Sequence, residues 1–359
     1  MKKTNYLLLV YLSLSVLAFG QVKTEAEDSL LQNLITTNKV VGAAAAYSIN
    51  GNTIWASAAG FSDSESKKAF EINTEVRTAS IAKSMTAIAV MQLVEQGLID
   101  IELPIDTYIP EFIQRGKVKI TTKHILSHTS GIDAYKNSKE TENKINYETL
   151  LDAYEVFKDR KLRFEPGTAY YYTSYGYVVL GILIEKVSGQ SYKQYMQQHI
   201  WDKAEMTQTG IENQQVERAN ATILYQKDRK GRLKEAKVNN LSNRVPGGGF
   251  YSTIGDLLKF GNALLNHTLV SESTLEFMIE HHSLEKVNNG YGFGFYLYGK
   301  QPNEGSIYGH SGTQTGCSTQ FFVIPSLKVV TVAVANTSGA GPNISSLAGQ
   351  LISIAQQKE

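Results

Sequence analysis

The stretch RTASIAKSMTAIAVMQLVEQG, residues 77–97, decides how the chain folds. From Ile81 to Val94 almost every residue is apolar, which predicts a helix buried in a core on nearly all sides. Gly97 supplies a C-terminal stop for that helix. Two polar side chains interrupt the pattern, because Ser80 lies at the helix start and Lys83 follows one turn later on the same face. A lysine in such a helix requires a partner.

The N-terminal residues have the layout of an export signal. Lys2 and Lys3 precede an apolar run at residues 6–17, which is followed by Ala18, Phe19, Gly20 and Gln21. We expect residues 1–20 to be a cleaved signal peptide, so that the protein is exported and is periplasmic or secreted in a bacterium. The run is shorter than the roughly 20 apolar residues of a spanning helix, so we expect no stable membrane span after cleavage, with an uncleaved anchor as the alternative.

The composition limits the kinds of binding partner that we expect and indicates what stabilises the fold. The formal net charge is +1 with charged residues well mixed, so we expect no nucleic-acid partner. Cys317 is the single cysteine and cannot form an internal disulfide, so the exported domain depends on its hydrophobic core. We expect a small or extracellular substrate, and the sequence does not predict an oligomeric state.

The order of sequence patterns predicts the fold class. Helices are expected at residues 25–37, 145–159, 174–189, 191–201 and 344–356, strands at 40–49, 53–61, 291–299, 306–310, 317–324 and 328–336, and a hairpin tip at 228–234. Strands therefore occur at both ends and helices in the middle. This predicts an α/β protein of the α+β type, with an antiparallel β-sheet flanked by helices and an inserted all-helical subdomain. We assign residues 21–105 and 241–359 to the sheet domain and 106–240 to the helical subdomain.

The Ser-x-x-Lys spacing is a weak signal by itself. Residues 64–67, SESK, share it but lie in a polar loop where charges are solvated. Ser80 differs in context, since a helix start favours negative charge and burial favours a neutral Lys83. A neutral lysine beside a hydroxyl can act as general base and make Ser80 a nucleophile. The alternative is that Ser80 only caps the helix while Lys83 reaches solvent or a carboxylate.

Two later segments favour the catalytic interpretation. Residues 164–182 read FEPGTAYYYTSYGYVVLGI, and residues 308–316 read YGHSGTQTG with His310 on an expected strand. The motifs resemble those of the serine β-lactamase and penicillin-binding protein superfamily, specifically its class C β-lactamase and DD-carboxypeptidase branch: Ser80-Ile81-Ala82-Lys83, Tyr172-Thr173-Ser174 and His310-Ser311-Gly312. Shorter family-like pieces are HTSG at 128–131, PGT at 166–168 and GGGFYST at 247–253. The resemblance covers nearly the whole mature chain and implies the same fold.

The resemblance also implies a mechanism. Ser80 attacks a carbonyl carbon to form an acyl-enzyme, while Lys83 and Tyr172 share the proton transfer. Which of the two is the base stays open, because tyrosine ionises near about pH 10 unless an adjacent lysine charge favours the phenolate. The backbone N–H groups of Ser80 and Thr313 hold the oxyanion.

The same strand is expected to bind the substrate. An extended substrate pairs with the segment that carries Ser311, and Gly312 permits its approach. His310 either steers a substrate carboxylate when protonated or hydrogen-bonds to Tyr172 or Ser311 when neutral. Two positions depart from the family pattern: His310 replaces the lysine of class C β-lactamases, and Ser174 stands where asparagine is usual. A hydroxyl is shorter and donates only one hydrogen bond, which disfavours efficient recognition of peptides and β-lactams and favours a promiscuous esterase or amidase.

The sequence therefore predicts a serine hydrolase that acts on a small peptide, ester or β-lactam without metal or cofactor. The first choice is a penicillin-binding-protein-like D-amino-acid peptidase or carboxypeptidase. A carboxylesterase and a class C-like β-lactamase are alternatives, and a catalytically silent penicillin-binding or sensor protein belongs to a different class. His124 and His128 have the spacing of two zinc ligands on a helix, but no glutamate follows His124, so structural roles are expected for both.

Overall fold

The computed structural model describes residues 24–280, 282, 290–299 and 307–358. The expected signal peptide, residues 1–20, lies outside these ranges. Within them, no helix is long and apolar enough to cross a membrane.

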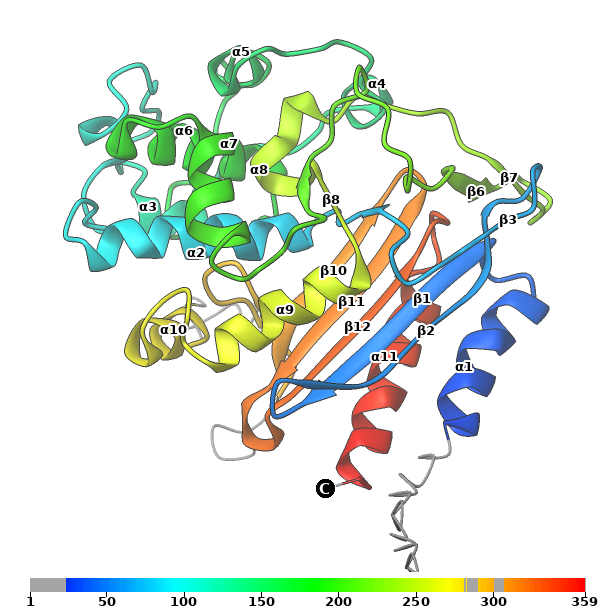
Figure 1. Ribbon diagram of the computed structural model, residues 1–359. Helices are drawn as coiled ribbons and strands as arrows, with labels where there is room; N and C mark the ends of the chain where they lie inside the picture. The colour runs from blue at the N-terminus through cyan, green and yellow to red at the C-terminus, as the bar shows by residue number, and fades with distance from the viewer. Residues whose placement is uncertain (1–23, 281, 283–289, 300–306, 359) are drawn as a thin grey trace, which may run out of the picture.

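A seven-stranded antiparallel sheet, counted over the described residues, forms the framework, in the order β3-β2-β1-β12-β11-β10-β9 (Figure 1). Its strands are β1 (Gly42–Ile49), β2 (Asn52–Asp63), β3 (Lys68–Ala69), β9 (Tyr296–Leu297), β10 (Tyr308–Gln314), β11 (Cys317–Ile324) and β12 (Val329–Ala335). Ala43 of β1 lies opposite Ala335 of β12. The two ends of the chain thus close one sheet, which confirms the predicted fold class.

Helices cover both faces of this sheet. α1 (Glu25–Thr36) and α11 (Gly341–Gln356) pack on one face, while α2 (Ile81–Glu95) and α9 (Ile254–Leu265) pack on the other (Figure 1). β1 is therefore buried along its whole length, with Ala43 and Ala45 in the α1–α11 core and Ala44 and Ala46 in the core of α2 and α9. Small side chains allow the helices to approach the sheet closely. The sheet separates two hydrophobic cores.

A helical region lies beside α2, with α6 at its centre. Its helices are η1 (Ile105–Thr107), α3 (Thr122–Leu126), α4 (Ser138–Thr141), α5 (Leu150–Glu155), α6 (Ser174–Ser188), α7 (Tyr192–Met196) and η2 (Gln197–Trp201). Thr173 caps the N-terminus of α6, and Gly189 ends the helix with φ of 70°. α6 packs against both α2 and α8 (Val245–Gly248), so the elements that carry the candidate residues are held together by the core.

Residues 210–235 differ from the expected all-helical subdomain. β5 (Gly210–Ile211) pairs with β8 (Phe250–Ser252), which also pairs with β4 (Val76–Arg77), and β6 (Tyr225–Lys227) forms a hairpin with β7 (Leu233–Glu235). Ala221 and Tyr225 form bridges to Glu75 and Thr337. Part of residues 210–235 therefore pairs with strands and loops of the sheet domain. Of these elements, the sequence predicted only the hairpin tip at 228–234. The remaining elements are η3 (Ser242–Arg244), α10 (Glu272–Met278) and η4 (Pro325–Leu327).

Candidate active site

Ser80 lies at the junction between β4 and α2. Ala79, just before it, has φ of 47°, a left-handed conformation that costs a non-glycine residue energy and is frequent at functional sites. Ser80 is partly exposed, and its side chain makes no capping hydrogen bond to α2. The alternative that Ser80 serves only as an N-cap is therefore wrong.

Lys83 is fully buried one turn into α2. Its Nζ lies 3.2 Å from Ser80 Oγ, 3.0 Å from Ser174 Oγ and 2.6 Å from the carbonyl oxygen of Gly247. All three partners are uncharged, so none compensates for the desolvation of an ammonium group. Burial lowers the pKa of Lys83 well below its usual value, and the charge of Arg244 lowers it further. The alternative of a snorkelling or carboxylate-paired lysine is also wrong.

Gly247 is a site residue whose role was not predicted. It lies in α8, and a Cβ added there would come within 2.9 Å of the backbone oxygen of Ser174. Glycine therefore lets α8 approach the start of α6, so that the Gly247 carbonyl and the Ser174 hydroxyl meet the same amine. The run GGGFYST was the only sequence signal for this contact.

Tyr172 approaches Lys83 with its ring. Lys83 Nζ lies 4.7 Å from the ring centroid, and the His128 ring packs against Tyr172 at 4.3 Å between centroids. The Tyr172 hydroxyl is buried and makes no hydrogen bond of standard geometry to a described residue, although Ser80 is near enough to act on its pKa. Burial raises that pKa well above 10, and the Ser80 hydroxyl opposes the rise only in part. Tyr172 is therefore a protonated phenol.

His310 is buried in β10 and both of its ring nitrogens have partners. Nδ1 lies 2.6 Å from the backbone oxygen of Ser311, and Nε2 lies 3.0 Å from the hydroxyl of Tyr291. Burial, followed by the charge of Lys83, lowers the pKa of His310 to about 3. Of the two roles expected for His310, the geometry matches the neutral one: Ser311 is a partner as expected, and Tyr291 takes the place of Tyr172.

The outer edge of β10 is largely unpaired within the described residues. β9 pairs only with Tyr308 and Gly309, so the segment that continues to Gln314 has no strand on that side in the described part of the chain. Ser311 and Thr313 are exposed along it. This edge can accept an extended chain as an added strand, as the sequence predicted.

Gly312 has a different role from the one predicted. It is buried, and an added Cβ would lie 2.6 Å from the carbonyl oxygen of Thr78 and 2.9 Å from Cβ of Ala79. The expectation that Gly312 makes room for substrate is wrong, because the segment that leads into Ser80 already occupies that space. Glycine here sets the spacing between β10 and the nucleophile.

Replacing Gly312 with alanine is expected to destabilise the protein by about 1–3 kcal/mol, because the new methyl group overpacks a backbone contact. Activity should fall as well, since relief of the clash displaces Thr78 and Ala79 from β10. Gly349→Ala in α11 is the matched control, since no atom lies within 4 Å of its added Cβ and alanine favours a helix by about 0.5–1 kcal/mol. Urea unfolding of both variants measures the difference, and equal stabilities would contradict the packing role.

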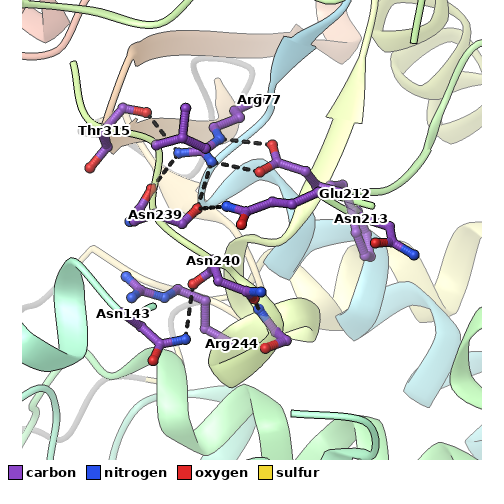
Figure 2. Close-up of polar contacts among 12 residues, drawn as sticks. Arg77, Asn143, Glu212, Asn213, Asn239, Asn240, Arg244 and Thr315 are labelled. Carbon is purple, nitrogen blue, oxygen red and sulfur yellow. Dashed lines mark hydrogen bonds and ion pairs between the residues drawn. The ribbon is translucent and has the colours of Figure 1, made fainter. Parts of the chain in front are cut away.

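Arg77, three residues before Ser80, contacts several chain segments around the site (Figure 2). Arg77 makes a two-point ion pair with Glu212, with Nε–Oε2 and Nη2–Oε1 distances of 2.8 and 2.5 Å. Its Nη1 also donates to Asn239 Oδ1 and to the carbonyl oxygen of Thr315, at 2.6 and 3.1 Å. One buried guanidinium thus joins the approach to Ser80 to the turn that follows β10. The sequence contained no recognised signal for the pair, because its members lie 135 residues apart.

His124 and His128 have structural roles, and the second Ser-x-x-Lys pair is exposed. His124 forms a capping box with Thr121 at the start of α3, and His128 Nδ1 accepts the N–H of Thr173 at 3.3 Å. In the described ranges no group of three or more His, Cys, Asp or Glu side chains could hold a metal ion. Residues 64–67 form an exposed turn, so SESK lacks the burial that lowers the pKa of Lys83.

The fold and the Ser80–Lys83 pair define the class of serine β-lactamase and penicillin-binding-protein folds. The chain belongs to the beta-lactamase family, whose family model matches residues 28–355. It is 29% identical over 308 residues to the serine beta-lactamase-like protein LACTB, mitochondrial, of Homo sapiens. The matched segments cover 67% of this chain and 56% of that protein. The chain thus spans just over half the length of the curated relatives that it matches first.

Two solved structures show the same fold. The octameric penicillin-binding protein homologue from Pyrococcus abyssi superposes with a TM-score of 0.80 at 24% identity, covering 93% of this chain and 78% of that one. The D-amino acid amidase from Ochrobactrum anthropi SV3 superposes with a TM-score of 0.81 at 18% identity, covering 93% and 99%. At these identities the likeness establishes the architecture only.

Proposed function

We propose that this protein is a serine hydrolase that cleaves an amide bond of a D-amino-acid substrate through an acyl-Ser80 intermediate. One observation carries the proposal: a fully buried lysine amine lies 3.2 Å from a partly exposed serine hydroxyl and has only uncharged partners. Burial keeps the amine neutral, and a neutral amine is a base. The proposed mechanism needs no metal or cofactor.

The three contacts of Lys83 can be made by a neutral amine. Such an amine has two hydrogens and one lone pair. It can donate to Gly247 O and Ser174 Oγ while its lone pair accepts the proton of the Ser80 hydroxyl. Lys83 is therefore the base in this proposal, and the choice left open between Lys83 and Tyr172 is made on geometry and pKa together.

Tyr172 is assigned the second proton transfer. Its buried phenol is protonated and its hydroxyl makes no standard hydrogen bond to a described residue, so it is free to donate to the leaving group. The oxyanion is assigned to the backbone N–H groups of Ser80 and Thr313. Ser80 immediately precedes α2, so its N–H lies outside the hydrogen-bond ladder of the helix, and the Arg77 contacts fix the strand turn two residues beyond Thr313.

The unpaired edge of β10 supports a peptide-like substrate, because an extended chain can hydrogen-bond along it. The structural likeness to a D-amino acid amidase agrees with a D-residue on the acyl side, which is the first choice from the sequence. We also propose that residues 1–20 direct export, so that the substrate is extracellular or periplasmic.

A carboxylesterase is the second candidate, and one contact favours it. The Ser174 hydroxyl is engaged by Lys83 Nζ at 3.0 Å, so it does not provide the amide contact that the usual asparagine makes to an acyl group. Esters require less ground-state recognition than peptides because they are intrinsically more reactive. A β-lactamase is the third candidate.

Labelling with a fluorophosphonate and a fluorescent penicillin tests the nucleophile. The wild-type protein should label, and Ser80→Ala should lose the label completely. Ser64→Ala, in the exposed SESK turn, is the matched control and should label like wild type. Equal labelling of Ser80→Ala would contradict the proposal.

Turnover then separates the candidates. A D-amino-acid amide, its L-enantiomer, a short nitrophenyl ester and a chromogenic cephalosporin are compared with one preparation. We expect the D-amide to exceed the L-amide. Ester turnover without D-amide turnover would reject the peptidase in favour of the esterase.

A further inference from the structure

We propose that the substrate bears no free carboxylate on its leaving group, so that the bond cleaved is an internal peptide bond, a primary amide or an uncharged ester. This inference rests on the proposed function and narrows it. A carboxypeptidase must instead recognise the terminal carboxylate of the residue that it releases. The buried basic side chains near Ser80 include His310, Lys83, Arg77 and Arg244, and each has partners within the protein.

His310 is the side chain that replaces the family's lysine, yet it offers nothing to an anion. The Ser311 carbonyl oxygen can only accept, so Nδ1 carries the hydrogen of that 2.6 Å contact. Nε2 of the neutral ring then has a lone pair and accepts the Tyr291 hydroxyl at 3.0 Å. No N–H of this tautomer is left for a carboxylate. Protonating Nε2 would place a charge at a fully buried position, and its N–H would still be directed at the Tyr291 hydroxyl oxygen, which would then accept.

Aromatic rings surround His310. The ring centroids of Tyr296, Tyr291 and Tyr172 lie 4.9, 5.7 and 6.1 Å from that of His310. Their faces carry negative quadrupole charge, which repels a carboxylate placed over them. The wall suits an uncharged group.

Lys83 cannot meet a carboxylate without losing its function. Its Nζ is already within hydrogen-bonding distance of Ser80, Ser174 and Gly247. A negative charge brought near it would favour the ammonium form and raise its pKa, because opposite charges stabilise each other strongly in a buried site. A substrate carboxylate at this position would therefore protonate the base that the reaction needs.

Two buried arginines lie in this region, and Figure 2 shows the contacts of Arg77. Arg77 is paired with Glu212. Arg244 donates to the carbonyl oxygens of Glu140 and Thr141 and to the side chain of Asn243. Arg77 thus uses all three of its nitrogens on partners within the protein, and Arg244 uses Nε and Nη2.

A matched substrate pair tests the inference. Acetyl-D-Ala-D-Ala and its C-terminal amide differ only in the charge on the leaving group, and the released D-alanine or D-alaninamide is measured by chromatography. We expect the amide to have a kcat/KM at least tenfold higher at pH 7. An equal or higher value for the free acid would overturn the inference.

An ester pair keeps the test valid if the enzyme is an esterase. Acetyl-D-alanyl glycolate and its glycolamide counterpart carry the same difference in charge, and the same tenfold preference is expected. If no probe labels Ser80 and neither pair is hydrolysed, the proposed function itself has failed. If Ser80 labels but the charged member of either pair is preferred, only the present inference has failed.

Variants test whether His310 sets the preference. Tyr291→Phe removes the hydroxyl that occupies Nε2, so the ratio of uncharged to charged substrate should fall at least threefold, most clearly at pH 5–6. Tyr154→Phe is the control, because the Tyr154 hydroxyl accepts the backbone N–H of Ile113 at 3.0 Å and its ring is not one of those that surround His310. An unchanged ratio in Tyr291→Phe would overturn the role assigned to His310.

Discussion

Replacing Lys83 with methionine is expected to lower kcat/KM by roughly 100- to 10,000-fold, the range that a positioned general base contributes. The free energy of unfolding should stay equal or rise. Lys83 is fully buried with uncharged partners, so its amine is desolvated without an ion pair, and methionine fills much of the same volume. A loss of activity without a loss of stability is expected for a residue that is kept for function although it lowers the free energy of unfolding.

Two measurements check this prediction. Steady-state kinetics on the D-amide gives kcat/KM, and urea unfolding gives the stability. Lys67→Met, in the exposed SESK turn, is the matched control and should change neither quantity. Activity of Lys83→Met within tenfold of wild type would remove Lys83 from the role of base.

The pH dependence of stability adds a second readout for Lys83. Its pKa is lowered in the folded protein, so the unfolded chain binds more protons between the folded pKa and the ordinary value of about 10.4. Wild-type stability should therefore rise with pH across that window. Lys83→Met should lack this part of the slope, whereas Lys67→Met should retain it.

Local patterns predicted much of the fold because they record burial directly. The apolar run of α2, the turn between β1 and β2, and the helix at Ile344 each follow from periodicity or turn chemistry, and the structure confirms them. Burial also separates the two Ser-x-x-Lys pairs. Ser80 and Lys83 lie in an apolar helix, whereas Ser64 and Lys67 lie in an exposed turn.

The missed features are contacts between distant segments. Gly247 meets Lys83 across 164 residues, and Arg77 meets Glu212 across 135. Neither contact has a periodicity that could be seen along one segment. The role of Gly312 was misjudged for the same reason, since the space beside it is filled by the chain before Ser80. Of the two partners expected for His310, Ser311 is present through its backbone oxygen, whereas Tyr291, which lies 19 residues away, was not predicted.

Replacing Arg77 with leucine is expected to lower the free energy of unfolding by about 3–5 kcal/mol, the usual cost of leaving one member of a buried ion pair without its partner. Arg77 and Glu212 have side-chain exposures of 2% and 8%. The substitution would leave the Glu212 carboxylate without its two-point partner and would release the Thr315 carbonyl oxygen. The double variant Arg77→Leu/Glu212→Leu should recover part of the loss, because no unpaired charge then remains.

An exposed pair gives the matched control for this experiment. Arg232 and Asp228 form an ion pair in which Arg232 is 74% exposed, so Arg232→Leu should cost less than about 1 kcal/mol. Arg77→Lys separates charge from geometry, since lysine keeps the charge but lacks the planar fork that meets both Glu212 and Thr315. It should retain more stability than Arg77→Leu, yet kcat should fall because the turn after β10 is no longer tied to the approach to Ser80. If Arg77→Leu lowered the free energy of unfolding no more than Arg232→Leu, the Arg77 network would be as weak as an exposed ion pair. It could then not hold Thr313 in place to bind an oxyanion.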